Sequence, residues 1–235
     1  MTDRPTMLLL HAGVADSGMW ARQIGLLEKR YRVLAPYTPG FGATPEPPGA
    51  FAPIDWAASQ LDGPSIVVGN SFGGRLALEL ALVRPELVEG LALIAPAIRD
   101  HTWSDELERF GAREEELVEA GDLDAAVEVN MEFWVQPHMR DFVRPMQRRA
   151  LELQLGAEEP LVWPEELPPF GSLDAPTLIV VGDRDVRDFV EIAERLASEL
   201  PNARLEVVHG AGHLPSLEAP DAFDRLLLEF LEHGI

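Results

Sequence analysis

Short runs of apolar residues recur along the chain, separated by longer stretches in which apolar and polar residues mix. Most of the runs are continuously apolar rather than alternating, which is the pattern of strands that are buried on both faces of a sheet. We therefore predict strands at 7–10, 32–35, 65–68, 91–94, 177–181 and 205–208.

Most of the stretches between these runs have the periodicity of amphipathic helices. Pro85 and Pro201 stand where two of the helices should end, and Asp188 is a candidate N-cap for a third. Strands that alternate with helices fold into parallel sheets with right-handed crossovers. We therefore predict an α/β fold with a mostly parallel, doubly wound sheet. The predicted helices lie near 18–29, 54–61, 72–84, 188–200 and 220–232.

One stretch, from about residue 99 to 171, interrupts this alternation because it contains helical patterns and no convincing strand. Three helices are expected there, at 104–120, 122–135 and 138–155. Ser104 and Asp122 are candidate N-caps, and Gly121 is a candidate end for the first helix. We interpret the stretch as a small helical cap inserted after the fourth strand. The core domain would then comprise 1–98 and 172–235, and the cap 99–171.

Composition restricts the possible partners. The chain has 235 residues, 46% of them hydrophobic, and carries 40 acidic against 19 basic residues, for a net charge of -21. A surface this acidic repels phosphate backbones and anionic membranes. Neither nucleic acid nor a membrane is therefore expected as a partner. The chain lacks cysteine, an apolar run long enough to span a membrane and a secretory signal. A cytoplasmic location is the expectation.

The most informative motif is Gly-Asn-Ser-Phe-Gly at 69–73, between a predicted strand and a predicted helix. A serine on such a sharp turn stands exposed above the sheet, and the turn requires small residues two positions before and after it. Ser71 is thus a candidate nucleophile. A serine that merely occupies a tight turn is the alternative.

A serine nucleophile needs a base and an acid that orients the base. His213 follows the last predicted strand in Gly-Ala-Gly-His, a flexible loop able to present an imidazole. The fifth strand ends in Gly-Asp-Arg-Asp, which offers two acids. Asp185 is preferred because its turn carries the carboxylate beyond the strand, whereas Asp183 is better placed to cap the turn.

The oxyanion that forms when a carbonyl is attacked needs fixed N–H donors. Phe72, which follows the nucleophile, supplies one backbone N–H. The loop after the first strand supplies the other, with Gly13 preferred to Val14. His11, in the same loop, is expected to brace the loop through hydrogen bonds rather than to act as a base.

These four motifs, at 11–13, 69–73, 182–185 and 210–213, resemble those of the α/β-hydrolase superfamily in type and order, from about residue 7 to the C-terminus. The chain looks most like small bacterial esterase- and lactonase-type members, including enol-lactonase-like proteins. The resemblance implies Ser71 as nucleophile, Asp185 as acid, His213 as base and the Gly13 and Phe72 N–H groups as oxyanion hole.

The expected activity is that of a serine esterase or lactonase, which cleaves a small-molecule carboxylic ester or lactone through an acyl-enzyme. A carbon–carbon bond hydrolase or a hydroxynitrile-lyase-like enzyme could use the same residues, and so could a slow-turnover receptor that retains the triad. A catalytically idle partner protein is a further alternative. Neither a metal nor a cofactor is expected, because the histidines lack paired ligand spacing and no dinucleotide fingerprint is present.

Aromatic and apolar residues of the cap and of the loops near the triad are candidates for a substrate pocket that accepts a small or medium, partly apolar acyl group. The cap arginines Arg140, Arg144, Arg148 and Arg149 recur at helical spacing, which favours a solvated helix face over a carboxylate clamp. The pocket candidates are Val14, Trp20, Trp103, Phe133, Trp134, Val186 and Leu214.

Overall fold

A computed structural model describes residues 4–45, 47, 49–155 and 161–235. The expected core and cap domains also include residues 1–3, 46, 48 and 156–160, which lie outside the described residues. All six predicted strands are present and form one parallel sheet in the order β2-β1-β3-β4-β5-β6. The strands are β1 (Thr6–Leu10), β2 (Arg32–Leu34), β3 (Ser65–Asn70), β4 (Val88–Ile94), β5 (Thr177–Gly182) and β6 (Ala203–Val208).

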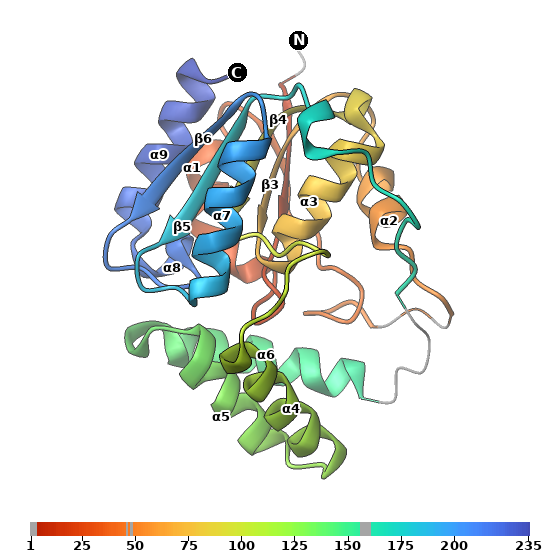
Figure 1. Cartoon of the computed structure of the whole chain (residues 1–235), viewed down its shortest axis with the longest axis vertical. Helices are drawn as coiled ribbons and strands as arrows, with labels where there is room; N and C mark the ends of the chain where they lie inside the picture. The colour runs from red at the N-terminus through yellow and green to blue at the C-terminus, as the bar shows by residue number, and fades with distance from the viewer. Residues whose placement is uncertain (1–3, 46, 48, 156–160) are drawn as a thin grey trace.

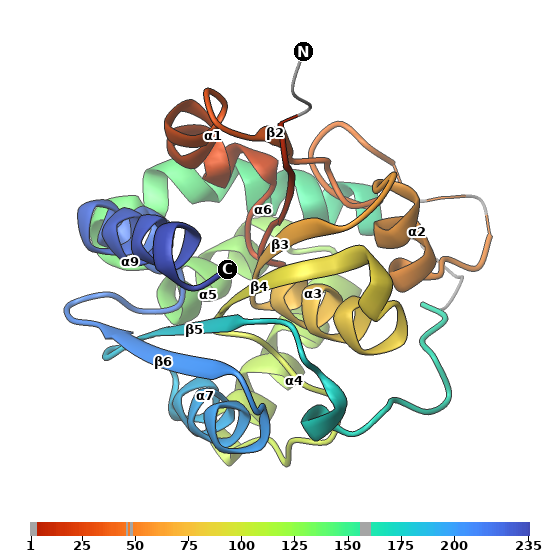
Figure 2. The same ribbon diagram turned by 90° about the horizontal axis from the view of Figure 1, so that it is seen from above.

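Helices cover both faces of the sheet, which confirms the doubly wound α/β fold (Figure 2). Alternate residues of β1 show why its run is continuously apolar: Met7 and Leu9 join one buried cluster, and Leu8 and Leu10 join another. The first cluster lies under α1 (Ala21–Leu27) and α9 (Pro220–His233), and the second under α2 (Pro53–Ser59), α3 (Phe72–Val83) and α7 (Arg187–Glu199).

The order of the strands determines where a site can form. From β1 the chain moves outward to β2, and from β3 it moves in the opposite direction toward β6. The loops that leave β1 and β3 therefore diverge, and ligands of such sheets bind in the crevice between diverging loops. In this chain the loop after β1 carries His11 and Gly13, and the turn after β3 carries Ser71.

Three helices between β4 and β5 pack against one another at the carboxyl ends of the strands (Figure 1). They are α4 (Asp105–Glu119), α5 (Leu123–Trp134) and α6 (Arg140–Gln154), close to the predicted ranges. The Oγ of Ser104 accepts the Leu107 N–H and the carboxylate of Asp122 accepts the Ala125 N–H, so both are N-caps. Gly121 has a φ of 74°, which suits the end of a helix.

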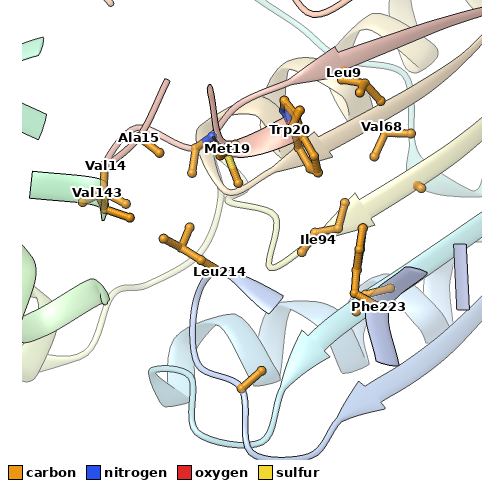
Figure 3. Packing of buried hydrophobic residues seen from close by; sticks show 14 of the residues in the cluster. Leu9, Val14, Ala15, Met19, Trp20, Val68, Ile94, Val143, Leu214 and Phe223 are labelled. Atoms are coloured by element: carbon orange, nitrogen blue, oxygen red, sulfur yellow. Dashed lines mark hydrogen bonds between the residues drawn. The ribbon is translucent and has the colours of Figure 1, made fainter. Parts of the chain in front are cut away.

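The apolar cluster on the α1/α9 face continues without a break into these three helices. Val143 of α6 is fully buried and belongs to the same cluster as Val14 of the loop after β1 (Figure 3). Met131 of α5 and Leu117 of α4 extend the cluster further. The three helices are therefore held to the sheet by buried apolar surface as well as by the connecting chain.

Asp188 is not an N-cap, contrary to the prediction. The N-cap of α7 is Val186, and Asp188 lies in the first turn with only 2% of its surface exposed. Its carboxylate accepts hydrogen bonds from the Ser104 N–H at 2.8 Å, the Ser104 Oγ at 2.6 Å and His101 Nε2 at 3.0 Å. These contacts, between segments far apart in the sequence, fix the start of α4 to α7.

Asp188 gives this attachment a defined pH dependence. Burial by itself would raise the pKa of the Asp188 carboxyl, but the hydrogen bonds from Ser104 and His101 outweigh it and hold the pKa below its ordinary value. Stability that comes from a lowered carboxyl pKa is present above the pKa of the unfolded chain and is lost as the pH falls through the folded-state pKa.

We expect Asp188→Asn to lower the free energy of unfolding at neutral pH by about 2 kcal/mol, because an amide cannot accept the same three hydrogen bonds. The difference from the unmodified protein should shrink as the pH falls below about 4, where the aspartate becomes protonated in the unfolded chain, and should be lost as the pH passes the lower pKa of the folded state. Urea unfolding at several pH values measures it. Asp174→Asn, at an exposed aspartate, is the control, and a difference that stays constant with pH would contradict the prediction.

Candidate active site

The turn between β3 and α3 holds Ser71 in a strained conformation, with φ 53° and ψ −110°. A non-glycine residue at positive φ costs free energy and persists only where its surroundings impose it. Here the chain passes so close to itself that a Cβ at Gly69 would overlap the carbonyl group of Gly73. A Cβ at Gly73 would in turn overlap the carbonyl group of Leu10. The two glycines of the motif are thus required by packing.

Backbone hydrogen bonds fix this turn to its neighbours. The Ser71 N–H donates to the Ile94 carbonyl at 2.8 Å, and the Gly73 N–H donates to the His11 carbonyl at 3.1 Å. Asn70 adds a side-chain contribution, because its Nδ2 donates to the carbonyls of Ile94 at 3.1 Å and His213 at 3.2 Å. The ends of β1, β3 and β4 and the loop that carries His213 are therefore connected to one another.

His213 and Asp185 form a buried pair. The Nδ1 of His213 lies 3.0 Å and 3.1 Å from the two carboxylate oxygens of Asp185, whose side chain is 0% exposed. The Val186 N–H donates to the same carboxylate at 2.8 Å. The alternative acid, Asp183, binds instead the His209 Nδ1 and the Gly210 N–H. The structure thus brings Asp185, and not Asp183, to His213.

Two aromatic rings confine the imidazole of His213. Trp134, from α5, lies 4.5 Å from it between ring centroids, and Phe189, from α7, lies 4.4 Å from it. Trp134 and Phe189 also contact each other edge to face at 5.7 Å. The orientation of the imidazole is therefore restricted by Asp185 on one nitrogen and by packing on its faces.

Ser71 and His213 line one cavity of about 530 Å³, a volume that suits a small-molecule ligand. Loops of the core form one side of it and the inserted helices the other. The core side includes Gly13, Val14, Thr38, Ser71, Phe72 and His213. The helical side includes Phe110, Glu114, Asn130, Trp134, Gln147, Leu151 and Gln154.

The N–H groups of Gly13 and Phe72 are available at this cavity. Phe72 is the first residue of α3, so its N–H has no acceptor within the helix. In the described part of the chain, no backbone or side-chain oxygen accepts a hydrogen bond from either group. A Cβ at Gly13 would lie 3.7 Å from the Cβ of Phe72, so the two residues are neighbours.

His11 braces the loop that carries Gly13. Its Nδ1 lies 2.9 Å from the Ala12 carbonyl, and its Nε2 lies 3.1 Å from the Thr38 N–H. The donor at Thr38 requires an unprotonated Nε2, so Nδ1 carries the proton. The side chain is fully buried, and burial lowers the pKa of this imidazole. His11 therefore stays neutral and holds the loops after β1 and β2 together.

The predicted pocket residues take different positions. Val14 and Trp134 line the cavity. Trp20 and Leu214 are fully buried in the apolar cluster, and Trp20 packs near Phe223 (Figure 3). Neither is among the described residues that line the cavity, because both point into the core.

The remaining three predicted pocket residues support the site from outside the cavity. Phe133 stacks on Phe110 at 4.2 Å and lines a separate hollow on the inserted helices. Trp103 packs against Phe189 at 5.9 Å. Val186 is the N-cap of α7 and donates its N–H to Asp185.

The arginine row on α6 makes contacts within the protein. Arg144 pairs with Glu128, and Arg148 pairs with Asp124 and with Glu152 at 2.9 Å. Arg140 donates to the Val135 carbonyl at 3.0 Å, and Arg149 to the Gly42 carbonyl at 3.3 Å. This pattern agrees with a solvated helix face and argues against a carboxylate clamp.

Sequence reasoning missed Glu218, at the end of the short helix α8 (Pro215–Glu218). Its carboxylate accepts the Gly212 N–H at 2.6 Å and the Gln136 N–H at 3.0 Å. Burial raises the pKa of this carboxyl, and the two N–H donors oppose the rise. Glu218 therefore connects the residue before His213 to the segment that follows α5. The sequence offers no signal for this beyond an acid shortly after the histidine.

The described residues contain no cluster of three or more histidines and carboxylates placed to hold a metal ion. Within the same residues, none of the helices combines the length and the apolar character that a membrane crossing requires.

Comparison with known proteins supports the assignment of the fold. A sequence model of the alpha/beta hydrolase family matches residues 7–226. The pimeloyl-(acyl-carrier protein) methyl ester esterase of Chromobacterium violaceum is 30% identical over 251 residues, which cover 97% of this chain and 94% of that protein. Carboxylesterase YbfK of Bacillus subtilis is 25% identical, with 99% of this chain and 82% of that protein covered.

Solved structures share the same architecture. Carboxylesterase CesB (YbfK) from Bacillus subtilis superposes with a TM-score of 0.79 at 22% identity, covering 100% of this chain and 86% of that one. The enol-lactonase from Burkholderia xenovorans superposes with a TM-score of 0.77 at 21% identity, covering 98% and 92%. At these identities the likeness shows the fold.

We expect Glu218→Ala to lower the free energy of unfolding by about 1–3 kcal/mol, because two N–H groups in a largely buried region lose their acceptor. Glu229→Ala, at an exposed glutamate on α9, should change it little. Thermal and urea unfolding of both variants measure the effect, and equal stabilities would contradict it.

Proposed function

This chain belongs to the alpha/beta hydrolase family, and from that premise we propose that it hydrolyses a carboxylic ester or lactone through an acyl-enzyme on Ser71. One observation carries the proposal. A serine on a strained strand–helix turn shares a cavity with an imidazole whose other nitrogen is held by a buried carboxylate. This is the arrangement that activates a serine hydroxyl as a nucleophile.

In the proposed mechanism the Oγ of Ser71 attacks the substrate carbonyl while His213 accepts the hydroxyl proton. Asp185 holds the imidazole in the required tautomer and stabilises its protonated form. The N–H groups of Gly13 and Phe72 bind the oxyanion. His213 then protonates the leaving alcohol, and in the second half-reaction it activates a water molecule that releases the acid and restores Ser71.

Relatives support ester chemistry in particular. A methyl ester esterase and a carboxylesterase align with nearly the whole chain. A lactone is a cyclic ester and is opened by the same steps, and an enol-lactonase shares the fold. Carbon–carbon hydrolysis and the lyase reaction could use the same residues, but neither of these two aligned relatives is named for such a reaction.

We expect Ser71→Ala to reduce hydrolysis of a short p-nitrophenyl ester by about a thousandfold or more, because the acyl group loses its attachment atom. A fluorophosphonate should label the unmodified protein at one site and leave Ser71→Ala unlabelled, as read by mass spectrometry. Circular dichroism and thermal unfolding serve as controls for folding. Hydrolysis or labelling that survives in Ser71→Ala would contradict the proposal.

We expect Asp185→Asn to lower kcat by about 10³- to 10⁴-fold with little change in KM, because an amide favours the wrong tautomer of His213. Asp183→Asn is a matched control two residues away, since Asp183 binds His209 and Gly210 instead. Steady-state kinetics of the two variants distinguish their roles. Equal losses in both would contradict the assignment of Asp185.

A further inference from the structure

The cavity that contains Ser71 and His213 carries one acid and no basic side chain other than His213 among the described residues that line it. The acid is Glu114 of α4. Arg113, its neighbour along the helix, pairs with Glu116 instead. Burial raises the pKa of the Glu114 carboxyl, because no cation offsets the loss of water around it. A carboxylate in this position would be stabilised by a positive charge from outside the protein.

The contacts within the protein do not require a negative charge at Glu114. Its Oε1 accepts a hydrogen bond from Asn130 Nδ2 at 2.6 Å, and the same nitrogen donates to the Ala126 carbonyl at 2.9 Å. An uncharged amide oxygen could accept the first of these bonds equally well. The Oε2 of Glu114 accepts no hydrogen bond from the described residues, and it is not among the unpaired atoms that are sealed from solvent. This oxygen is therefore available to a ligand.

Two aromatic side chains line the cavity beside Glu114. Phe110 lies one turn earlier on α4, four residues before Glu114 and hence on the same side of the helix. Trp134 of α5 meets Phe110 edge to face, with 5.3 Å between ring centroids. Both side chains are only partly buried. Aromatic rings attract cations through their quadrupoles, so a carboxylate among such rings suits an ammonium group.

Trp134 also connects this part of the cavity to the proposed catalytic residues, because its ring lies 4.5 Å from that of His213. The cavity of about 530 Å³ can therefore hold an ester at Ser71 and a charged group of the same small molecule near Glu114. An anionic group in its place would meet an acid and no cation, apart from His213 in its protonated form.

We propose that Glu114, together with Phe110 and Trp134, binds a positively charged nitrogen of the ammonium type in the substrate, so that the preferred esters are cationic. This inference rests on the proposed function and names the substrate class of the same site. The cation belongs either to the acyl part or to the alcohol part of the ester, and the experiment has one arm for each.

The catalytic test uses two pairs of esters that match in shape and differ in charge. In the acyl pair, p-nitrophenyl ω-trimethylammoniohexanoate is compared with p-nitrophenyl ω-tert-butylhexanoate. In the alcohol pair, butyrylcholine is compared with tert-butylethyl butyrate. In the unmodified protein we expect kcat/KM for the cationic ester to exceed that for the neutral ester by about tenfold in at least one pair.

Glu114→Gln keeps the shape of the side chain and an acceptor for Asn130, and it removes the charge. We expect it to lower the ratio of cationic to neutral ester by about tenfold. Glu115→Gln is the matched control, because it changes the net charge equally at an exposed neighbour that is not among the residues lining the cavity. It should leave the ratio unchanged.

The control is needed because a chain with a net charge of -21 attracts cations from a distance whatever its cavity binds. A ratio near one in both ester pairs of the unmodified protein overturns the inference. A ratio that falls equally in Glu114→Gln and Glu115→Gln also overturns it. Thermal unfolding of both variants serves as the control for folding.

A binding test separates this inference from the proposed function. Ser71→Ala protein is titrated with the amides of the two acyl groups and with choline and tert-butylethanol, and binding is followed by ligand-observed NMR. Tighter binding of the cation in either pair, lost when Glu114→Gln is added, supports the inference even if no ester is hydrolysed. Equal binding within both pairs, or a preference for the cation that survives Glu114→Gln, overturns it even if Ser71-dependent ester hydrolysis is found.

Discussion

The close packing of three backbone segments at the end of β3 is the constraint on which the site depends. Gly69 and Gly73 leave no space for a side chain, so the turn at Ser71 contacts the carbonyl groups at the end of β1 directly. That contact holds the loop of Gly13 beside Phe72 through the bond from Gly73 to His11. Because the strand order reverses between β1 and β3, this turn lies at the place where the loops that leave the sheet diverge.

The inserted helices complete the site because polar and apolar contacts attach them to the core. Buried apolar surface joins α5 and α6 to the loop after β1. Asp188 and Glu218 add hydrogen bonds at two separate points, one at the start of α4 and one after α5. Trp134 then reaches His213, so a helix outside the core contributes to the position of the imidazole.

Much of the fold and the proposed catalytic residues could be predicted from the sequence, because strand periodicity and the short motifs around Ser71, Asp185 and His213 are local patterns. Other features depend on packing between distant segments. Asp188 was expected to cap a helix, but its carboxylate meets Ser104 across the fold. Trp20 and Leu214 could not be distinguished from pocket residues, since apolar side chains near a site and in the core look alike in a sequence. Gln147 gave no signal because its burial follows from helix packing.

At position 71, the residue that would best suit the backbone conformation differs from the residue that the proposed reaction requires. A glycine there would adopt φ 53° without the penalty that a Cβ brings, and it would remove the hydroxyl. Natural variation that improved folding at this position would therefore eliminate the reaction proposed for it. Conservation of serine at position 71 in related chains would therefore indicate selection for catalysis. A glycine at this position would indicate that the reaction has been lost.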